Sequence, residues 1–322
     1  MRKFIKKIVT FIMLFLVTLI AVVLFDYYVL GNQHLGNYEA AILDKTARLN
    51  SIDEPKIILV GNSSLAFGMD SKMLEEAMGM PVVNMGLHGA LGNAFCEDMA
   101  KAGISEGDIV VVCHLDYSDD DSIEDPALAL ITVEKHRELW PLIRLKDCLG
   151  IARAYPDYFK DCIMYKYTKE DDNTPEDTTC YSRSAFNEYG DICRRFKDDD
   201  NFEFFEGCVT VPEINMVCIN RLNKLNEYVT DHGAVMVIAG YPIGDGEYTP
   251  DRSEYEEFER QLRSLADCEV ISHFTDYFIP YEYFYDTRYH LDDQGVQIRT
   301  EQLIEDLHKW MGPILKTADR RM

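Results

Sequence analysis

The chain of 322 residues is long enough for one large domain or two modest ones, and its 47% hydrophobic content supports a real core. Its formal net charge is −24; setting aside the four basic residues among the first seven leaves 28 basic against 56 acidic residues. Such a surface repels phosphate, which argues against nucleic-acid binding and against lying flat on an anionic lipid surface. The nine cysteines form no C-x-x-C pair, so the sequence predicts no metal site and no cofactor.

The first predicted element is a membrane anchor over residues 1–31. The basic stretch MRKFIKK precedes Ile8 to Phe25, a run of 18 uncharged, mostly apolar residues, near the short end of what spans about 30 Å of hydrocarbon. The basic flank favours a cytoplasmic amino end. No small-x-small cleavage site follows, so an uncleaved signal anchor is favoured over a removed signal peptide. A buried core helix is the weaker alternative because the run has no polar face.

After the anchor the sequence predicts alternating strands and helices. Residues 32–55 are expected to form a mostly helical, polar connector, residues 56–312 a domain, and residues 313–322 a tail. Apolar, β-branched runs predict strands over 57–60, 81–85, 108–113, 234–239 and 269–271. Helical periodicity predicts helices over 71–78, 90–103, 212–232, 251–266 and 293–310. This alternation is typical of a parallel, doubly wound sheet.

The alternation is interrupted between about residues 116 and 211. That stretch is rich in aromatic residues and carries acidic runs at 119–121, 171–172 and 198–200. Acidic runs are typical of a solvated face, and no spaced ligand loop accompanies them as a cation site requires. We expect a largely helical insertion that leaves the carboxyl end of the third strand and covers the rim of a site there.

A strand-to-helix turn supplies the first candidate for chemistry. The residues Gly61-Asn62-Ser63-Ser64 follow the strand at 57–60, and carboxyl ends of strands are where open α/β sheets bind ligands. Ser63 is the predicted nucleophile and Ser64 is its rival. The structural alternative is a serine-rich turn with a helix cap.

A loop before the last predicted helix supplies the second candidate. His290 lies there, four residues after Asp286. Serine is a weak nucleophile until a base takes its proton, and the base needs a partner that holds its tautomer. The chain order Ser63, Asp286, His290 therefore predicts nucleophile, orienting acid and base. Alone, His290 is more typical of a solvated or capping residue.

These residues together resemble the SGNH (GDSL-like) hydrolases of the membrane-anchored bacterial type. The family's Gly-Asp-Ser block corresponds to residues 61–63, the glycine after its second strand to Gly86, and its final Asp and His to Asp286 and His290. Here the final pair is spaced by four residues where the family has three. The resemblance implies a flavodoxin-like three-layer α/β/α sandwich with a parallel sheet, in which Ser63 is the nucleophile and the Gly86 amide an oxyanion donor.

The chain departs from the family at the third block. The family has an Asn after the third strand, and residues 112–118 contain none. An ionised Asp116 cannot donate a hydrogen bond, whereas the hydroxyl of Tyr117 can. Losing one oxyanion donor typically costs about 3–4 kcal/mol of transition-state stabilisation. Gly86, Tyr117 and Asn62 are the predicted oxyanion- and substrate-binding residues.

The resemblance implies a membrane-anchored, extracytoplasmic serine acyl-ester hydrolase or O-acyltransferase. Its expected substrate is an acylated cell-envelope glycan or teichoic acid, because the chain is similar to teichoic-acid D-alanine-transfer proteins and exopolysaccharide O-acetyltransferases. A multi-spanning membrane acyltransferase is the expected partner. The missing third-block Asn favours one alternative: a non-catalytic surface protein of the same fold that binds glycan or such a partner. A metal-dependent phosphatase is disfavoured because spaced His and Asp ligands are lacking.

Overall fold

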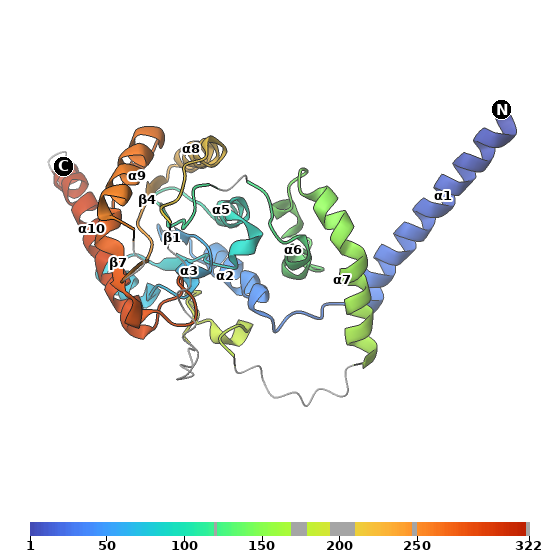
Figure 1. Cartoon of the computed structure of the whole chain (residues 1–322), viewed down its shortest axis with the longest axis horizontal. Helices are drawn as coiled ribbons and strands as arrows, with labels where there is room; N and C mark the ends of the chain where they lie inside the picture. The colour runs from blue at the N-terminus through green and yellow to red at the C-terminus, as the bar shows by residue number, and fades with distance from the viewer. Residues whose placement is uncertain (119–120, 169–178, 194–209, 247–249, 320–322) are drawn as a thin grey trace.

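The computed structural model describes residues 1–118, 121–168, 179–193, 210–246 and 250–319. The chain is an α/β protein with a mostly parallel sheet and an apolar N-terminal helix (Figure 1). Of the predicted acidic runs, 171–172 and 198–200 lie outside the described residues, as do two of the three residues in 119–121.

The central sheet has five parallel strands in the order β2-β1-β3-β4-β6. They are β1 (Ile57–Val60), β2 (Val82–Asn84), β3 (Ile109–Val112), β4 (Val235–Ile238) and β6 (Glu269–Val270). All five predicted strands are therefore present, and each lies within its predicted range. A second, two-stranded parallel sheet of β5 (Ile243–Asp245) and β7 (Phe278–Pro280) was not predicted. The carboxyl ends of β1 and β3 meet at one edge because the two strands pair in parallel register.

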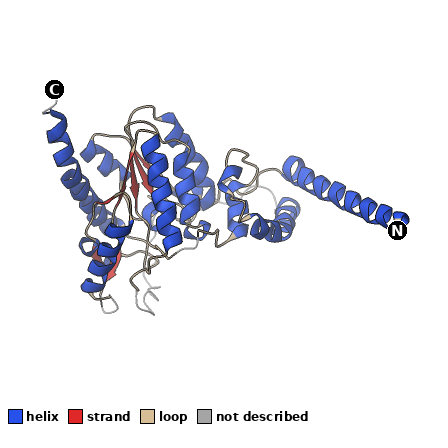
Figure 2. Cartoon of the chain, turned by 90° about the horizontal axis from the view of Figure 1, so that it is seen from above, coloured by secondary structure: helices blue, strands red, loops and turns tan. Residues whose placement is uncertain are grey.

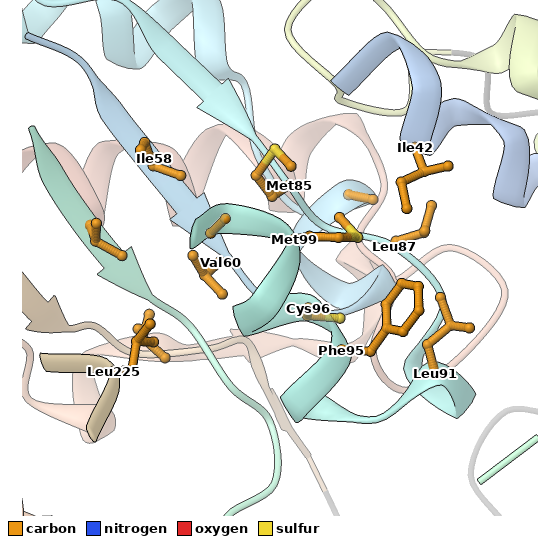
Figure 3. Close-up of a cluster of buried hydrophobic side chains, with 14 of the residues drawn as sticks. Ile42, Ile58, Val60, Met85, Leu87, Leu91, Phe95, Cys96, Met99 and Leu225 are labelled. Atoms are coloured by element: carbon orange, nitrogen blue, oxygen red, sulfur yellow. The ribbon is translucent and has the colours of Figure 1, made fainter. Parts of the chain in front are cut away.

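Both faces of the central sheet are buried under helices. Successive residues of a strand point to opposite faces, so the side chains of β1 divide between two cores. On one face Ile58 and Val60 share a core with side chains of α2 (Ala41–Ser51), α5 (Asn93–Lys101) and α8 (Met216–Asp231). Figure 3 shows part of this core, with Ile42, Phe95 and Leu225 around the strand. On the other face Ile57 and Leu59 pack with side chains of α4 (Ser71–Met78) and α10 (Asp293–Asp319).

The connector after the anchor is part of the domain. It contains η2 (Tyr38–Ala40) and α2, whose Ile42 is fully buried. Lys45, also in α2, is 2% exposed and donates through Nζ to the backbone carbonyl of Asn84 at 2.8 Å. The connector is thus largely helical, as predicted, and its polar residue Lys45 is buried and bonds to backbone oxygens.

The described part of the insertion combines helices with irregular segments, so it is less helical than predicted. It contains α6 (Pro126–Val133) and α7 (Cys148–Thr168), which pack against each other, and α7 also contacts η1 (Asp26–Leu30). α1 (Arg2–Phe25) projects from this end of the molecule with no buried residue, whereas α9 (Arg252–Leu265) and α10 lie at the opposite end (Figures 1 and 2). With η1, α1 is long and apolar enough to cross a membrane.

Candidate active site

The serine turn lies directly at the carboxyl end of β1. β1 ends at Val60 and the short helix α3 (Ser63–Ala66) begins at Ser63. Asn62 caps this helix, because its side-chain Oδ1 accepts a hydrogen bond from the Ser64 amide at 3.0 Å. Gly61 fits here because a Cβ would lie 3.1 Å from the Cys113 carbonyl oxygen at the end of β3. The close approach of the two strand ends holds the turn in place.

The structure brings Ser63, His290 and Asp286 into one hydrogen-bonded chain. His290 Nε2 lies 3.0 Å from Ser63 Oγ, and His290 Nδ1 lies 2.8 Å from Asp286 Oδ1. The loop that carries the acid and the base is closed by the Tyr285 amide, which donates to the His290 carbonyl at 2.8 Å. This closure places the side chains of residues 286 and 290 on the same side of the loop. The arrangement satisfies the geometry for a base that takes a proton from Ser63.

The imidazole of His290 is held on a second side by an aromatic ring. Its ring is stacked on Phe67 with centroids 4.0 Å apart and an interplanar angle of 8°. His290 is only 5% exposed. Stacking and the bond to Asp286 together leave the imidazole one orientation, with Nε2 directed at Ser63 Oγ.

Tyr181, from the insertion, is a member of the site that the sequence did not indicate. Its hydroxyl donates to Asp286 Oδ2 and lies 3.4 Å from His290 Nδ1. Burial raises the pKa of Asp286, but the hydrogen bonds from His290 and Tyr181 outweigh it, so the net pKa lies below the ordinary value. Burial and the bond to Asp286 raise the pKa of Tyr181, so its hydroxyl stays protonated as a donor. Asp286 is therefore ionised and acts as an acceptor for both partners.

Three residues that line the cavity each carry a hydrogen-bond donor with no acceptor among the described residues. The donors are the Ser63 amide, the Gly89 amide and Nδ2 of Asn62. A Cβ on Gly89 would lie 3.7 Å from Asn62 Nδ2, so Gly89 and the side chain of Asn62 are neighbours. Gly89 opens the turn η3 (Gly89–Leu91), three residues after the glycine that the sequence indicated. Such a set of donors is what a developing oxyanion requires.

Two predicted oxyanion donors lie away from this cavity. The Gly86 amide already donates to Asn84 Oδ1 at 2.8 Å, and a Cβ on Gly86 would lie 2.6 Å from the Ala66 nitrogen. Gly86 thus lets the loop after β2 pack against α3. Tyr117 is fully buried with its ring edge-on to Phe258, and within the described chain its hydroxyl has no partner. Of the three predicted residues only Asn62 lines the cavity.

The rival nucleophile Ser64 faces the interior. It is 0% exposed, and its hydroxyl has no hydrogen-bond partner in the part of the chain that the structure describes. Its carbonyl accepts a 2.7 Å hydrogen bond from Nη1 of the buried Arg299 in α10. Ser64 therefore fixes α3 to the last helix, and Ser63 alone of the pair faces His290.

The cavity in front of Ser63 has a volume of about 770 Å³. Polar and aromatic side chains form much of its wall, among them Asp116, Glu124, Glu213, Tyr241, Tyr255, Arg288 and Tyr289. Residues 116, 118, 124, 210 and 211 of the predicted insertion also line it. The insertion thus contributes both to the wall of the cavity and, through Tyr181, to the chain of hydrogen bonds behind it.

Comparison with protein-family models, with curated proteins and with solved structures found no match. The site must therefore be interpreted from its own geometry. In the described ranges no group of three or more His, Cys, Asp or Glu side chains is arranged to hold a metal ion.

Proposed function

We propose that the protein is a serine acyl-ester hydrolase or O-acyltransferase of the SGNH type. The observation that carries the proposal is the hydrogen-bonded chain Ser63–His290–Asp286 at a cavity whose lining residues carry three further donors. The strand order 2-1-3-4 continued by β6 supports the flavodoxin-like assignment that the sequence resemblance implies.

The geometry supports a two-step acyl transfer. Ser63 Oγ attacks the acyl carbonyl carbon while His290 Nε2 takes the hydroxyl proton, and Asp286 stabilises the resulting imidazolium. The carbonyl oxygen becomes an oxyanion that the Ser63 amide, the Gly89 amide and Asn62 Nδ2 are placed to bind. The bond to the alcohol leaving group then breaks, and His290 returns the proton to that alcohol. Water completes a hydrolysis, and a sugar hydroxyl completes a transfer.

The proposed substrate is an acylated cell-envelope glycan or teichoic acid. The cavity supports this class because both aromatic residues, such as Tyr241 and Tyr289, and polar residues line it, and sugar rings offer a face for the first and hydroxyls for the second. The proposed location is the outer side of the cytoplasmic membrane, with α1 as an anchor, its basic end in the cytoplasm and a multi-spanning membrane acyltransferase as partner.

A fluorophosphonate probe tests the proposed nucleophile. We expect covalent labelling of the wild type and none of Ser63→Ala, because the probe reports an activated serine. Ser64→Ala is the matched control: it removes the neighbouring hydroxyl and should keep the label. Labelling that persists in Ser63→Ala would contradict the assignment of the nucleophile.

The non-catalytic binding protein is the second candidate, and the absent third-block Asn favours it. It predicts no labelling of the wild type at any pH, and glycan binding that survives Ser63→Ala. The enzyme predicts that a deletion strain and a Ser63→Ala strain change the ester-linked acyl groups of the envelope alike.

Protease accessibility tests the location. Protease added to intact protoplasts should degrade the domain, since the basic flank favours a cytoplasmic amino end. Full protection of the domain would contradict an extracytoplasmic site while leaving the proposed chemistry untouched.

A further inference from the structure

A buried ion pair joins the base of α1 to the insertion. Asp26, the first residue after α1, is 5% exposed, and its Oδ1 accepts from Lys135 Nζ at 2.7 Å. Its Oδ2 accepts from the Tyr155 hydroxyl at 3.0 Å, and Lys135 also donates to the Tyr158 hydroxyl at 2.9 Å. Burying two charges carries a desolvation cost that their hydrogen bonds offset, so the pair adds little to the free energy of unfolding. It does require the two segments to lie in a defined relative position. Through Tyr155 and Tyr158, this cluster joins the base of α1 to α7.

Further contacts run along the same junction. The ring of Phe25, the last residue of α1, lies 6.4 Å from the ring of Phe159 in α7. Lys166, near the end of α7, donates to the backbone carbonyls of Val29 and Leu30. The chain between α1 and the domain is therefore packed against α7, so α7 must lie close to the surface of whatever membrane α1 enters.

The outer face of α7 has the composition of a helix at a membrane surface. Exposed residues recur at helical spacing at positions 149, 153, 156, 160, 164 and 167. Leu149 and Tyr167 are 61% and 65% exposed, and Leu145, just before the helix, is 93% exposed. Arg153 and Lys160 lie between them on the same face, and the exposed Asp157 and Asp161 border it, so the face carries little net charge. Apolar side chains and tyrosine suit the boundary of the acyl chains, and Arg and Lys suit lipid phosphates.

We propose that the outer face of α7 rests in the lipid headgroup layer of the membrane that α1 enters. The proposal builds on the proposed anchoring by α1. In both views α7 lies at the end of the molecule from which α1 projects (Figures 1 and 2). The strongly acidic remainder of the chain is repelled by anionic lipid, whereas the outer face of α7 is nearly neutral and exposes the apolar side chains of Leu149 and Met164. The active site is then held at a fixed height and orientation.

Depth-dependent quenching in proteoliposomes tests this placement. The full chain, with Trp140→Phe and Trp310→Phe, is reconstituted in phosphatidylcholine–phosphatidylglycerol vesicles that contain lipids brominated either near the headgroup, to report position 149, or near the end of the acyl chains, to report position 16 at the middle of the span. A reporter is introduced singly as Leu149→Trp, as Leu16→Trp within α1, or as Val235→Trp at the amino end of β4. Val235 is 49% exposed and serves as the matched control, because it is an exposed apolar residue of the domain outside the proposed contact.

We expect the bromolipids to quench the reporter at position 149 and to leave that at position 235 unquenched. Lys135→Met removes the ion-pair partner of Asp26, so α7 should be held less firmly beside α1 and the quenching at position 149 should weaken. If that variant does not fold, Tyr155→Phe, which removes only one hydrogen bond to Asp26, should weaken the quenching in the same way. Quenching at position 16 with none at 149 overturns the placement of α7 and leaves the anchor intact. No quenching at position 16 overturns the anchor itself. If a photoreactive residue at 149 crosslinks in cells to a protein and not to lipid, a protein partner covers this face and the lipid proposal is wrong.

Discussion

The change Asn62→Asp gives the sharpest test of the donors around Ser63. It restores the Gly-Asp-Ser order of the family that the chain resembles, yet we expect it to inactivate the protein. Asn62 uses Oδ1 to cap α3 and leaves Nδ2 as a donor on the cavity. An Asp keeps the cap, loses the donor and places a negative charge beside the developing oxyanion.

The expected size of the effect follows from these two roles. Loss of one oxyanion donor lowers kcat by about 10²- to 10³-fold, or roughly 2.7–4 kcal/mol. The free energy of unfolding should change by less than about 0.5 kcal/mol, because Asp caps helices as well as Asn and suits the helix dipole. Asn62→Ala is the informative comparison, since it loses the donor and the cap together, at a stability cost of about 1 kcal/mol.

Release of p-nitrophenol from p-nitrophenyl acetate measures kcat, and urea unfolding in detergent micelles measures stability. An Asn62→Asp protein as active as the wild type would refute the assignment of Asn62 as the donor that replaces the absent Asn. Equal losses of stability in the Asp and Ala variants would refute the capping argument.

Of three other predictions, two concern the hydrogen-bonded chain of the site and the third concerns the buried Lys45. Ser63→Ala and His290→Gln should each abolish nearly all esterase activity, and the double variant should be no worse, since a triad acts as a unit; additive losses would contradict this. Tyr181→Phe should lower kcat roughly tenfold, because Asp286 loses a hydrogen bond worth about 1.5 kcal/mol that helps to keep it ionised and in place behind His290; a kcat equal to that of the wild type would remove Tyr181 from the site. Burial lowers the pKa of Lys45 to about 7. Between about pH 7 and pH 10 the unfolded chain therefore binds more protons than the folded one, so the free energy of unfolding rises with pH, by up to about 1.4 kcal/mol per pH unit. Urea unfolding of Lys45→Met should show a smaller rise from pH 7 to pH 9, and a slope equal to that of the wild type would contradict the argument.

The central strands could be predicted because their sequence is nearly all β-branched and apolar. The run Ile57–Val60 is predicted to the residue, and the other four strands lose only end residues. The sheet of β5 and β7 could not be predicted, because each strand has three residues and they include Gly244 and Pro280. Such strands exist only through their pairing with each other, which no local pattern records.

The contact among Ser63, Asp286 and His290 could be expected because Ser63 follows the end of β1 and the other two lie in the loop before α10, and a parallel sheet gathers such connections at the carboxyl ends of its strands. Tyr181 could not, since its contact with Asp286 spans 105 residues and the chain contains 19 tyrosines with no distinguishing pattern. Gly89 was missed for another reason. Three glycines, Gly86, Gly89 and Gly92, lie between β2 and α5, and only the packing against α3 shows that Gly86 is a packing residue whose amide is already bonded.

The distance along the chain between Ser63 and His290 has a consequence for how the protein matures. The two residues are separated by 227 positions, and β4, β6 and α10 all lie between them or after them. Contacts of such long range form late, because the intervening chain must first be made and ordered. A nascent or partly exported chain therefore carries the serine for most of its synthesis without a base beside it. Esterase activity requires the last part of the domain, so truncated or stalled chains should be inactive.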